Sequence, residues 1–319
     1  MAVLPAQPAV KLGEIKGVIS PLLRQVFGSR SRITEVVIQN QKSDYLVLLL
    51  QLIHPFQKIV MKLAGPTAPI ACPFDRTAVF YQIVDEQTDI LMPKIFAVDV
   101  TYQTWPWRYI IKSWIPGEEW ATVRQTITQE GLSTAHEAIG HAVAQLHNIH
   151  FPSFGEISTE GTIQPDQSLY QALRLRARSI IADPQYVEFF LSVLDRNAHL
   201  FEYSNQASLC HEDLHHHNLL FNLVQGQWRL STILDFDKAW AGHSESDLAR
   251  LELWKGMTSK AFWDSYLLTS TVSPLYPRRR PVYQLLWCLE FAVPSPQHIF
   301  DTQQVCDALG VQLPKPFGD

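Results

Sequence analysis

The sequence of 319 residues predicts an α+β protein with two lobes, the first built on an antiparallel β-sheet and the second mainly helical. Segments rich in β-branched residues, joined by short turns, dominate the first third, whereas stretches with apolar residues at helical spacing dominate the rest. Between them, Trp114-Ile115-Pro116-Gly117 breaks the pattern, because proline and glycine interrupt regular elements. We therefore expect one lobe over residues 1–113 and the other over residues 114–319.

The first lobe is expected to begin with three strands in an antiparallel meander, because β-branched runs alternate with short turns. These strands are expected over residues 33–38, 45–53 and 58–63. Gly65-Pro66 ends the third strand, since proline cannot continue a β ladder. Helical spacing then predicts a helix over residues 74–84, and the last two strands are expected over residues 94–98 and 108–111.

The second lobe is expected to contain at least three helices. The segment 134–147 has an apolar stripe at helical spacing, made of Ala138, Ile139, Ala142, Val143 and Leu146. Two more helices are expected over residues 170–181 and 186–203, divided by Asp183-Pro184. The basic run Arg278-Arg279-Arg280 lies between two prolines and is interpreted as a solvated turn.

The composition argues against several classes of protein. A formal net charge of −5 does not favour a nucleic-acid binder. Residues 1–13 contain two prolines and no apolar core, unlike a secretory signal, and the longest apolar stretch, residues 45–53, is shorter than the roughly 20 residues that cross a bilayer. No C-x-x-C pair occurs among the four cysteines, Cys72, Cys210, Cys288 and Cys306. Neither zinc nor a disulfide framework is therefore expected. We expect a cytoplasmic protein that binds neither nucleic acid nor membrane; the oligomeric state stays open.

The most informative segment for chemistry runs from Leu209 to Leu251. Asp213 and Asn218 follow H-x-D-x-x-x-x-N spacing, and a later apolar strand ends at Asp235. Phosphoryl transfer needs a group that orients the acceptor hydroxyl and takes its proton, and oxygen ligands for Mg²⁺ at the phosphates. A loop carboxylate followed by amide and carboxylate oxygens meets these needs, in the spacing of a kinase catalytic loop and its metal-binding Asp.

At these residues the sequence resembles the aminoglycoside phosphotransferase and choline-kinase-like family of small-molecule kinases, which has a protein-kinase-like fold. The resemblance extends to Lys62 at the end of the third strand, to the segment that joins the lobes, and to Gln145-Leu146-His147 at the end of a helix. It spans about Ile33 to Trp254. The resemblance implies Mg²⁺-dependent transfer of the γ-phosphate of ATP or GTP to a hydroxyl of a small molecule.

The resemblance also implies roles for residues of the catalytic half. Asp213 would be the catalytic base or the group that orients the hydroxyl. His211 would brace the loop, and Asp247 would fix the second lobe by hydrogen bonding to it. Asn218 and Asp235 would hold Mg²⁺.

In the first lobe, the resemblance implies a nucleotide site. Lys62 would pair with the α- and β-phosphates, and the backbone from Lys112 to Trp114 would meet the nucleotide base. The loop of residues 39–44 lacks the glycines of a phosphate-binding loop, but Ser43 would still offer hydrogen-bond donors.

The catalytic loop departs from the usual pattern of the family. Glu212 and His217 stand where the loop usually has glycine, so its backbone angles would differ or the loop would be tighter. The charge of Glu212 is expected to raise the pKa of Asp213 or alter the acceptor preference. The histidines of this loop could ligate a metal, but no second ligand set lies at suitable spacing, and roles in packing or hydrogen bonding are favoured. Asp237 and Glu245 are expected to be surface charges.

A further departure concerns Lys62. Thr77 stands where the following helix should carry a glutamate to pair with this lysine, with Asp75 and Glu86 as the candidate substitutes. Thr77 and Glu212 therefore keep a rival hypothesis open, in which the protein is a nucleotide-binding scaffold, or pseudokinase, without turnover. A protein kinase ranks third, because the loop after Asp235 lacks a long activation segment. The region 159–195 is not notably acidic, which favours an acceptor alcohol other than an aminoglycoside.

Overall fold

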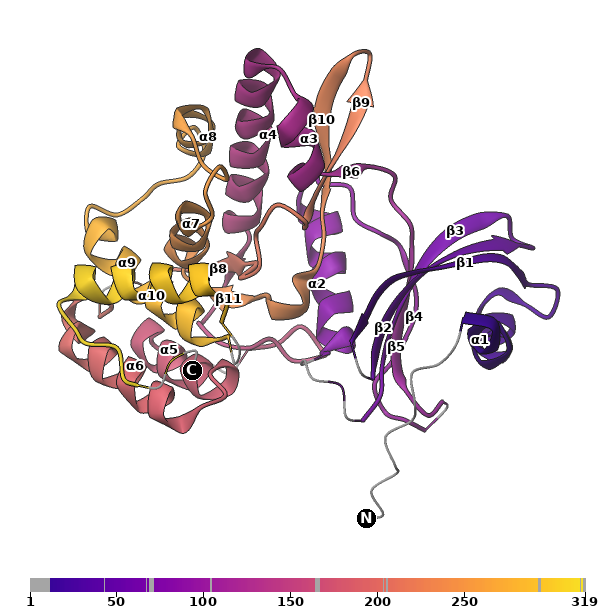
Figure 1. Ribbon diagram of the computed structural model, residues 1–319, viewed down its shortest axis with the longest axis horizontal. Helices are drawn as coiled ribbons and strands as arrows, with labels where there is room; N and C mark the ends of the chain where they lie inside the picture. The colour runs from indigo at the N-terminus through magenta and orange to yellow at the C-terminus, as the bar shows by residue number, and fades with distance from the viewer. Residues whose placement is uncertain are drawn as a thin grey trace. The chain divides into compact units, whose positions relative to one another are not determined.

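The computed structural model of this chain describes residues 12–42, 44–66, 68, 72–103, 105–163, 167–202, 204, 206–291, 294–315 and 317, with residues 12–14 and 42 described by their backbone alone. The chain forms two compact units, coloured from indigo to yellow along the sequence in Figure 1. The first unit comprises Met1–Glu86 and Leu91–Pro116, and the second comprises Gln87–Ile90 and Gly117–Asp319.

The first unit is built on a five-stranded antiparallel sheet with the strand order β1-β2-β3-β5-β4. Its elements are α1 (Leu12–Phe27), β1 (Arg32–Lys42), β2 (Tyr45–Ile53), β3 (Gln57–Ala64), α2 (Phe74–Gln87), β4 (Ile95–Asp99) and β5 (Arg108–Ser113). All five strands and the helix expected over residues 74–84 are confirmed; β2 has the expected ends, β4 is shifted by one residue, and the others extend by one to four residues at one or both ends. Helix α1 was not predicted from the sequence.

The two faces of this sheet are covered by different helices (Figure 1). Helix α1 packs an apolar stripe onto one face, and this stripe consists of Ile15, Ile19, Leu22 and Leu23. The even-numbered residues of β2, among them Leu48 and Leu50, point to the same face, as the two-residue period of a strand requires. Phe74, at the start of α2, packs on the opposite face with Tyr45 and Ile110.

The second unit is mainly helical, with two small sheets. Its first half contains β6 (Glu118–Glu119), α3 (Trp120–Thr126), α4 (Gln129–His147), β7 (His150–Phe151), α5 (Leu169–Ile180), α6 (Pro184–Arg196) and the 3₁₀ turn η1 (Ala198–Leu200). Its second half contains β8 (Ala207–Cys210), β9 (Leu219–Val224), β10 (Gln227–Ile233), the 3₁₀ turn η2 (Phe236–Lys238), β11 (Trp240–Gly242), α7 (Ser244–Leu253), α8 (Lys260–Tyr266), α9 (Tyr276–Leu289) and α10 (Pro296–Leu309). The sheet of the first unit and the helices of the second confirm the predicted α+β class.

Two small antiparallel sheets position the loops of the second unit. One has the strand order β10-β9-β6 and the other β11-β8-β7. Helix α4 packs on α8, and α9 packs on both α7 and α10, as Figure 1 also shows. The helices expected over residues 134–147 and 170–181 are confirmed as α4 and α5.

Three interpretations of the second unit were wrong. The helix expected over residues 186–203 ends at Arg196, because Asn197 caps it with a side-chain hydrogen bond to the Val193 carbonyl before η1 begins. Arg278-Arg279-Arg280 belongs to α9 rather than to a solvated turn. Within it, buried Arg279 donates to the Leu200 carbonyl and pairs at 3.1 Å with Glu245, which is itself buried rather than on the surface. Because Arg279 and Glu245 neutralise each other, both charged side chains can be buried.

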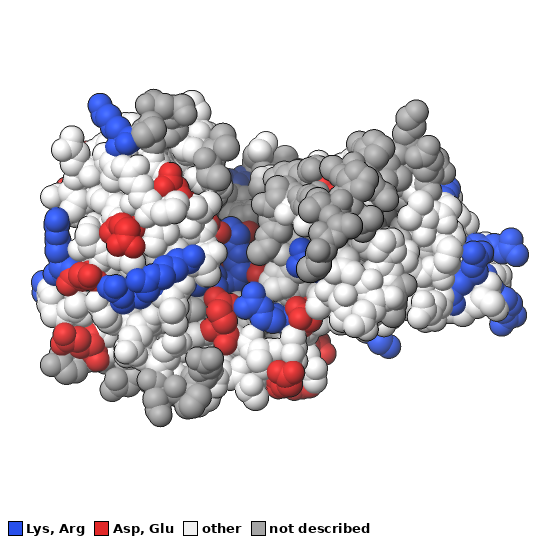
Figure 2. Space-filling view, turned by 90° about the horizontal axis from the view of Figure 1, so that it is seen from below, with Lys and Arg blue, Asp and Glu red and all other residues white. Residues whose placement is uncertain are grey.

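The distribution of charge, the hydropathy of the helices and the state of the cysteines complete the description of the fold. On the face shown in Figure 2, acidic and basic side chains form small separate groups among residues of neither kind. None of the helices in the described ranges is both long enough and apolar enough to span a membrane. All four cysteines are buried free thiols.

Candidate active site

The loop of residues 211–218 joins two strands that belong to different sheets. It leaves β8, which is buried between β7 and β11, and enters β9, which pairs with β10 and β6. Inside the loop, the Asn218 N–H donates to the His215 carbonyl at 3.0 Å and closes a turn. The predicted H-x-D-x-x-x-x-N segment is therefore a connection held at both ends by strands.

Asp247 of α7 anchors the start of this loop. One oxygen of its fully buried carboxylate accepts from the His211 N–H at 2.6 Å, and the other accepts from the Glu212 N–H at 2.7 Å. The His147 ring lies 3.3 Å from the same carboxylate. Burial opposes ionisation of Asp247, but the bonds from His147 and His211 outweigh it and lower its pKa. A charged acceptor thus holds the two loop amides, as a charge-assisted hydrogen bond requires.

His211 connects the loop to the end of β10. Its Nε2 donates to the Leu234 carbonyl at 2.8 Å, and its Nδ1 accepts from the Asp213 N–H at 3.1 Å. Burial lowers the pKa of His211 and keeps the ring neutral, which matches a ring that donates through one nitrogen and accepts through the other. The Leu234 N–H in turn donates to the Asn218 carbonyl at 2.8 Å. The loop and the segment after β10 are therefore tied at two points.

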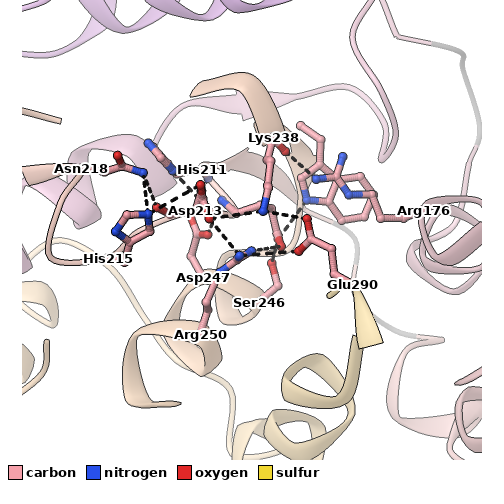
Figure 3. Close-up of polar contacts among 12 residues, drawn as sticks. Arg176, His211, Asp213, His215, Asn218, Lys238, Ser246, Asp247, Arg250 and Glu290 are labelled. Carbon is pink, nitrogen blue, oxygen red and sulfur yellow. Dashed lines mark hydrogen bonds and ion pairs between the residues drawn. The ribbon is translucent and has the colours of Figure 1, made fainter. Parts of the chain in front are cut away.

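Asp213 is held by two cations through a single oxygen (Figure 3). Arg250 Nη2 lies 3.0 Å and Lys238 Nζ 3.4 Å from Oδ1, whereas Oδ2 lies 3.8 Å from Nε2 of His215. Burial would raise the pKa of Asp213, but Arg250, Lys238 and His215 together lower it. The rise in the pKa of Asp213 that was expected from the charge of Glu212 is wrong, because the positive charges of Arg250 and Lys238 outweigh the effects that raise it. The alternative effect of Glu212, an altered acceptor preference, stays a prediction.

Glu212 keeps a backbone conformation that glycine favours. Its φ of 60° lies in the left-handed region, which costs an ordinary residue about 1 kcal/mol. Its buried carboxylate accepts from Ser246 Oγ and, at 3.1 Å, from Trp240 Nε1, and Arg250 lies 4.0 Å away. Burial raises the pKa of Glu212, with Asp247 as the next cause. Glu212 therefore combines a left-handed backbone with a side chain that points towards α7 and β11.

Asn218 and Asp235 offer oxygens suited to Mg²⁺. The Asn218 amide donates through Nδ2 to the Asp213 carbonyl at 2.8 Å, which turns its Oδ1 the other way. Asp235 follows β10 with a φ of 69°, in the left-handed region, where few non-glycine residues lie and which recurs at functional sites. Hard cations prefer amide and carboxylate oxygens. The bond between Leu234 and Asn218 brings the two segments together, so this donor set fits the ion.

The neighbouring histidines have protein partners. His216 contacts the Arg124 guanidinium and lies 3.1 Å from the Lys255 carbonyl, and burial with the nearby Arg124 lowers its pKa to about 4. His217 Nδ1 lies 2.5 Å from Glu119 Oε2. Among the residues that the structure describes, no three His, Cys, Asp or Glu side chains are grouped as a metal site.

The residues proposed for the nucleotide lie in the first unit. Lys62 is buried in β3 on the sheet face that carries Phe74, opposite the face covered by α1. Thr77 is also buried, and its hydroxyl donates to the Pro73 carbonyl. Of the candidate substitutes for the missing glutamate, Glu86 is exposed and accepts from Gln82. Asp75 accepts from the Arg76 N–H at the start of α2.

Lys112 and Trp114 occupy the end of β5 and the segment that follows. Lys112 is buried, and its ammonium donates to Tyr81 Oη at 2.7 Å. The Trp114 N–H donates to the Lys58 carbonyl, and Lys58 lies over the Trp114 ring. Ser43 lies outside the described residues.

Several residues around Asp213 were missed by the sequence analysis. Arg250 lies three residues after Asp247 on helix α7, most of which is buried. A charged residue between the apolar residues of this helix was the only sequence feature that could have pointed to it. Lys238 lies three residues after Asp235. No signal was available for Glu290, which follows α9 and lies beyond the stretch, about Ile33 to Trp254, over which the sequence resembles the kinase family.

Comparison with known proteins places the chain among phosphotransferases. Residues 59–282 match the model of the phosphotransferase enzyme family. No curated protein matches the chain closely enough in sequence to count as a relative.

Solved structures show the same fold at low identity. A thermostable mutant of the aminoglycoside phosphotransferase APH(4)-Ia, in a ternary complex with AMP-PNP and hygromycin B, has a TM-score of 0.61 at 14% identity, over 93% of this chain and 97% of that one. An ethanolamine kinase of Plasmodium vivax has a TM-score of 0.54 at 14% identity, over 86% and 82%. Spectinomycin phosphotransferase APH(9)-Ia, with ADP and spectinomycin, has 0.54 at 11%, over 95% and 98%. The predicted protein-kinase-like fold is confirmed.

Proposed function

This chain belongs to the phosphotransferase enzyme family, and we propose that it transfers the γ-phosphate of ATP or GTP, with Mg²⁺, to a hydroxyl of a small molecule. The observation that carries the proposal is the placement of Asp213. Its loop is anchored by Asp247, and one of its oxygens is held by two cations while the other faces His215. Similar folds in complexes with AMP-PNP, ADP or GDP support a nucleotide donor.

The residues of the loop would prepare the acceptor for reaction. Asp213 Oδ2 would accept the hydrogen bond of the acceptor hydroxyl and take its proton as the oxygen forms a bond to the γ-phosphorus. The bond between that phosphorus and the leaving nucleoside diphosphate breaks in the same transfer. Asn218 and Asp235 would hold Mg²⁺, which supplies neutralisation of phosphate charge when bound. Because its pKa is lowered, Asp213 is ionised near neutral pH and ready to accept.

The nucleotide roles of the first unit are part of the same proposal. Lys62 would pair with the α- and β-phosphates, the segment from Lys112 to Trp114 would meet the base, and Ser43 would donate to phosphate. We propose the first unit as the nucleotide-binding lobe and the second as the catalytic and substrate-binding lobe.

The acceptor is proposed to be an alcohol that is not a polycation. Glu290 lies near Asp213, but Lys238 and Arg250 already neutralise it. A polycationic acceptor would have to displace those cations. A screen that pairs an aminoglycoside such as kanamycin with uncharged sugar alcohols tests this choice, and preferential turnover of kanamycin would contradict it.

Asp213→Asn tests the proposed reaction. The amide keeps the shape of the side chain but cannot take a proton, so we expect phosphoryl transfer to fall by at least about a hundredfold. Calorimetry with ATP and GTP should meanwhile show nucleotide affinity unchanged. A fully active Asn variant would refute the role of Asp213.

Asp235→Asn is the companion variant, and it tests the metal site. It should remove the Mg²⁺-dependent part of nucleotide binding. A wild-type protein that binds nucleotide but transfers phosphate to no acceptor and to no water would instead support the pseudokinase alternative.

A further inference from the structure

The stability of helix α9 does not explain why a glutamate occupies position 290. Glu290 caps the C-terminal end of α9, and its N–H donates to the Trp287 carbonyl. A negative charge at this end of a helix is unfavourable, because the exposed carbonyls already carry partial negative charge. Its side chain is only 14% exposed, so the carboxylate is also largely removed from water. Some other interaction must hold the charge there.

That interaction is with the two cations that hold Asp213. Glu290 Oε1 lies 2.7 Å from Lys238 Nζ, and Oε2 lies 3.6 Å from Arg250 Nη2. The same two cationic groups approach Asp213 Oδ1 at 3.4 and 3.0 Å. Figure 3 shows the two carboxylates on either side of the two cations. Two positive and two negative charges thus form one compact cluster.

Helix α9 holds Arg250 from two points. Trp287 and Glu290 are three residues apart and therefore lie on one side of the helix end. The Arg250 guanidinium lies over the Trp287 ring at 5.0 Å, in addition to its pair with Glu290. Arg250 itself is only 3% exposed, so few other positions are open to it. Lys238 is more exposed, at 36%, and depends more on its carboxylate partners for a fixed place.

We propose that Glu290 is a positioning residue for phosphoryl transfer, which holds Lys238 and Arg250 so that both engage Oδ1 of Asp213 and leave Oδ2 for the acceptor hydroxyl. This inference rests on the proposed function of the same site. Glu290 lies beyond the part of the chain that matches the family model, so the segment after that match completes the site of this protein. Without the carboxylate, Lys238 loses its closest anionic partner, and the rotation of the Asp213 carboxylate is no longer fixed.

Glu290→Gln tests the proposal in the full-length protein. The amide keeps the size of the side chain but removes its charge. Phosphate release from Mg²⁺-ATP or Mg²⁺-GTP, which needs no identified acceptor, is the assay. We expect kcat to fall by about ten- to a hundredfold with the nucleotide KM unchanged, as for a misplaced reacting group.

The matched control is Glu252→Gln. Glu252 also pairs α7 with α9, through Arg280 and the Tyr276 hydroxyl, but it makes no contact in the Asp213 cluster. It should leave kcat unchanged, and both variants should melt cooperatively. Lys238→Met alone and combined with Glu290→Gln completes a double-mutant cycle. Because Glu290 acts in part through Lys238, its closest cationic partner, the double variant should lose less activity than the product of the two single losses.

The outcomes separate the two levels of inference. Wild-type turnover that Asp213→Asn abolishes, together with a Glu290→Gln variant as active as wild type, overturns the positioning role alone. Fully multiplicative losses in the cycle overturn it as well. A crystal structure of Glu290→Gln in which both cations still hold Oδ1 would do the same. A wild-type protein that binds nucleotide but transfers phosphate neither to water nor to any alcohol of the acceptor screen overturns the proposed function and the positioning role together.

Discussion

At the scale of single residues, the catalytic loop and the segment after β10 combine buried charge with left-handed backbone. Glu212 and Asp235 both have positive φ, and both stand next to groups of the proposed reaction. The strain at Glu212 is offset by neighbours, since Asp247 holds its amide and Ser246 holds its carboxylate. The sequence marked Glu212 as a departure from the family pattern, but only the contacts reveal that the loop accommodates it.

His243, at the start of α7, should make the protein sensitive to acid. Burial, followed by the charge of Arg279, lowers its pKa to about 3, and its Nδ1 accepts from the Tyr283 hydroxyl at 3.0 Å. Below the unfolded pKa of about 6.5 the unfolded chain takes up a proton that the folded chain does not. The free energy of unfolding therefore falls as the pH falls from about 6.5 towards 3.

His243→Asn isolates this effect, because an amide oxygen can accept the same hydrogen bond and does not titrate. Between pH 7.5 and pH 5, urea unfolding should show the wild type losing about 2 kcal/mol more stability than the variant. Equal losses would mean that His243 does not titrate as its burial requires.

At the scale of elements, close approach between helices limits which residues fit. Gly140 of α4 faces α8 so closely that an added Cβ would lie 2.3 Å from the Phe262 carbonyl oxygen. Gly17 of α1, by contrast, has no atom within 4 Å of that position. Both glycines lie inside helices, so replacing either by alanine changes the intrinsic helix propensity by the same amount. Only the space around the added methyl group differs.

Alanine at these two positions should act in opposite directions. Gly140→Ala should destabilise by about 2 kcal/mol or more, because backbone cannot move aside as a flexible side chain can. Gly17→Ala should stabilise by roughly 0.5–1 kcal/mol through helix propensity. Thermal melting of both variants measures the signs, and a neutral Gly140→Ala would contradict the packing of α4 on α8.

At the scale of the whole molecule, the pattern of apolar residues predicted the strands and the helix α2 of the first unit and the helices α4 and α5 of the second, and the spacing of polar residues predicted the loop. The strands of the first unit were found because β-branched runs and turns alternate along the chain. Buried charges were misread, since Arg279 and Glu245 resemble surface residues until each is seen to neutralise the other. Helix α1 was missed because the role of its apolar residues becomes clear only when the sheet on which they pack is known. Glu290 was missed because its partners, Lys238 and Arg250, are far from it in the sequence.

The four cysteine thiols are distributed over both units, so their reaction with a thiol reagent can follow the unfolding of each unit separately. Cys72 is buried in the first unit, and Cys210, Cys288 and Cys306 are buried in the second. Burial raises the pKa of Cys288 to about 12 and that of Cys306 to about 11, so reactive thiolate is scarce in the folded protein.

A thiol reagent should therefore label the protein only as it unfolds in urea. Because each unit has its own buried core, we expect Cys72 to react in a different step from the other three. A Cys72→Ser variant identifies its step, and a single transition for all four thiols would show that the units unfold as one.

The carboxylate of Asp247 has a consequence for motion in the catalytic loop. It holds the amide protons of His211 and Glu212, which precede it by 36 and 35 positions in the chain. Those protons can exchange with solvent only when α7 separates from the loop, so local opening of the helix and loss of the loop are a single event. The amide protons of this loop should therefore exchange as slowly as those of the buried helix α7, although the loop belongs to no helix or strand.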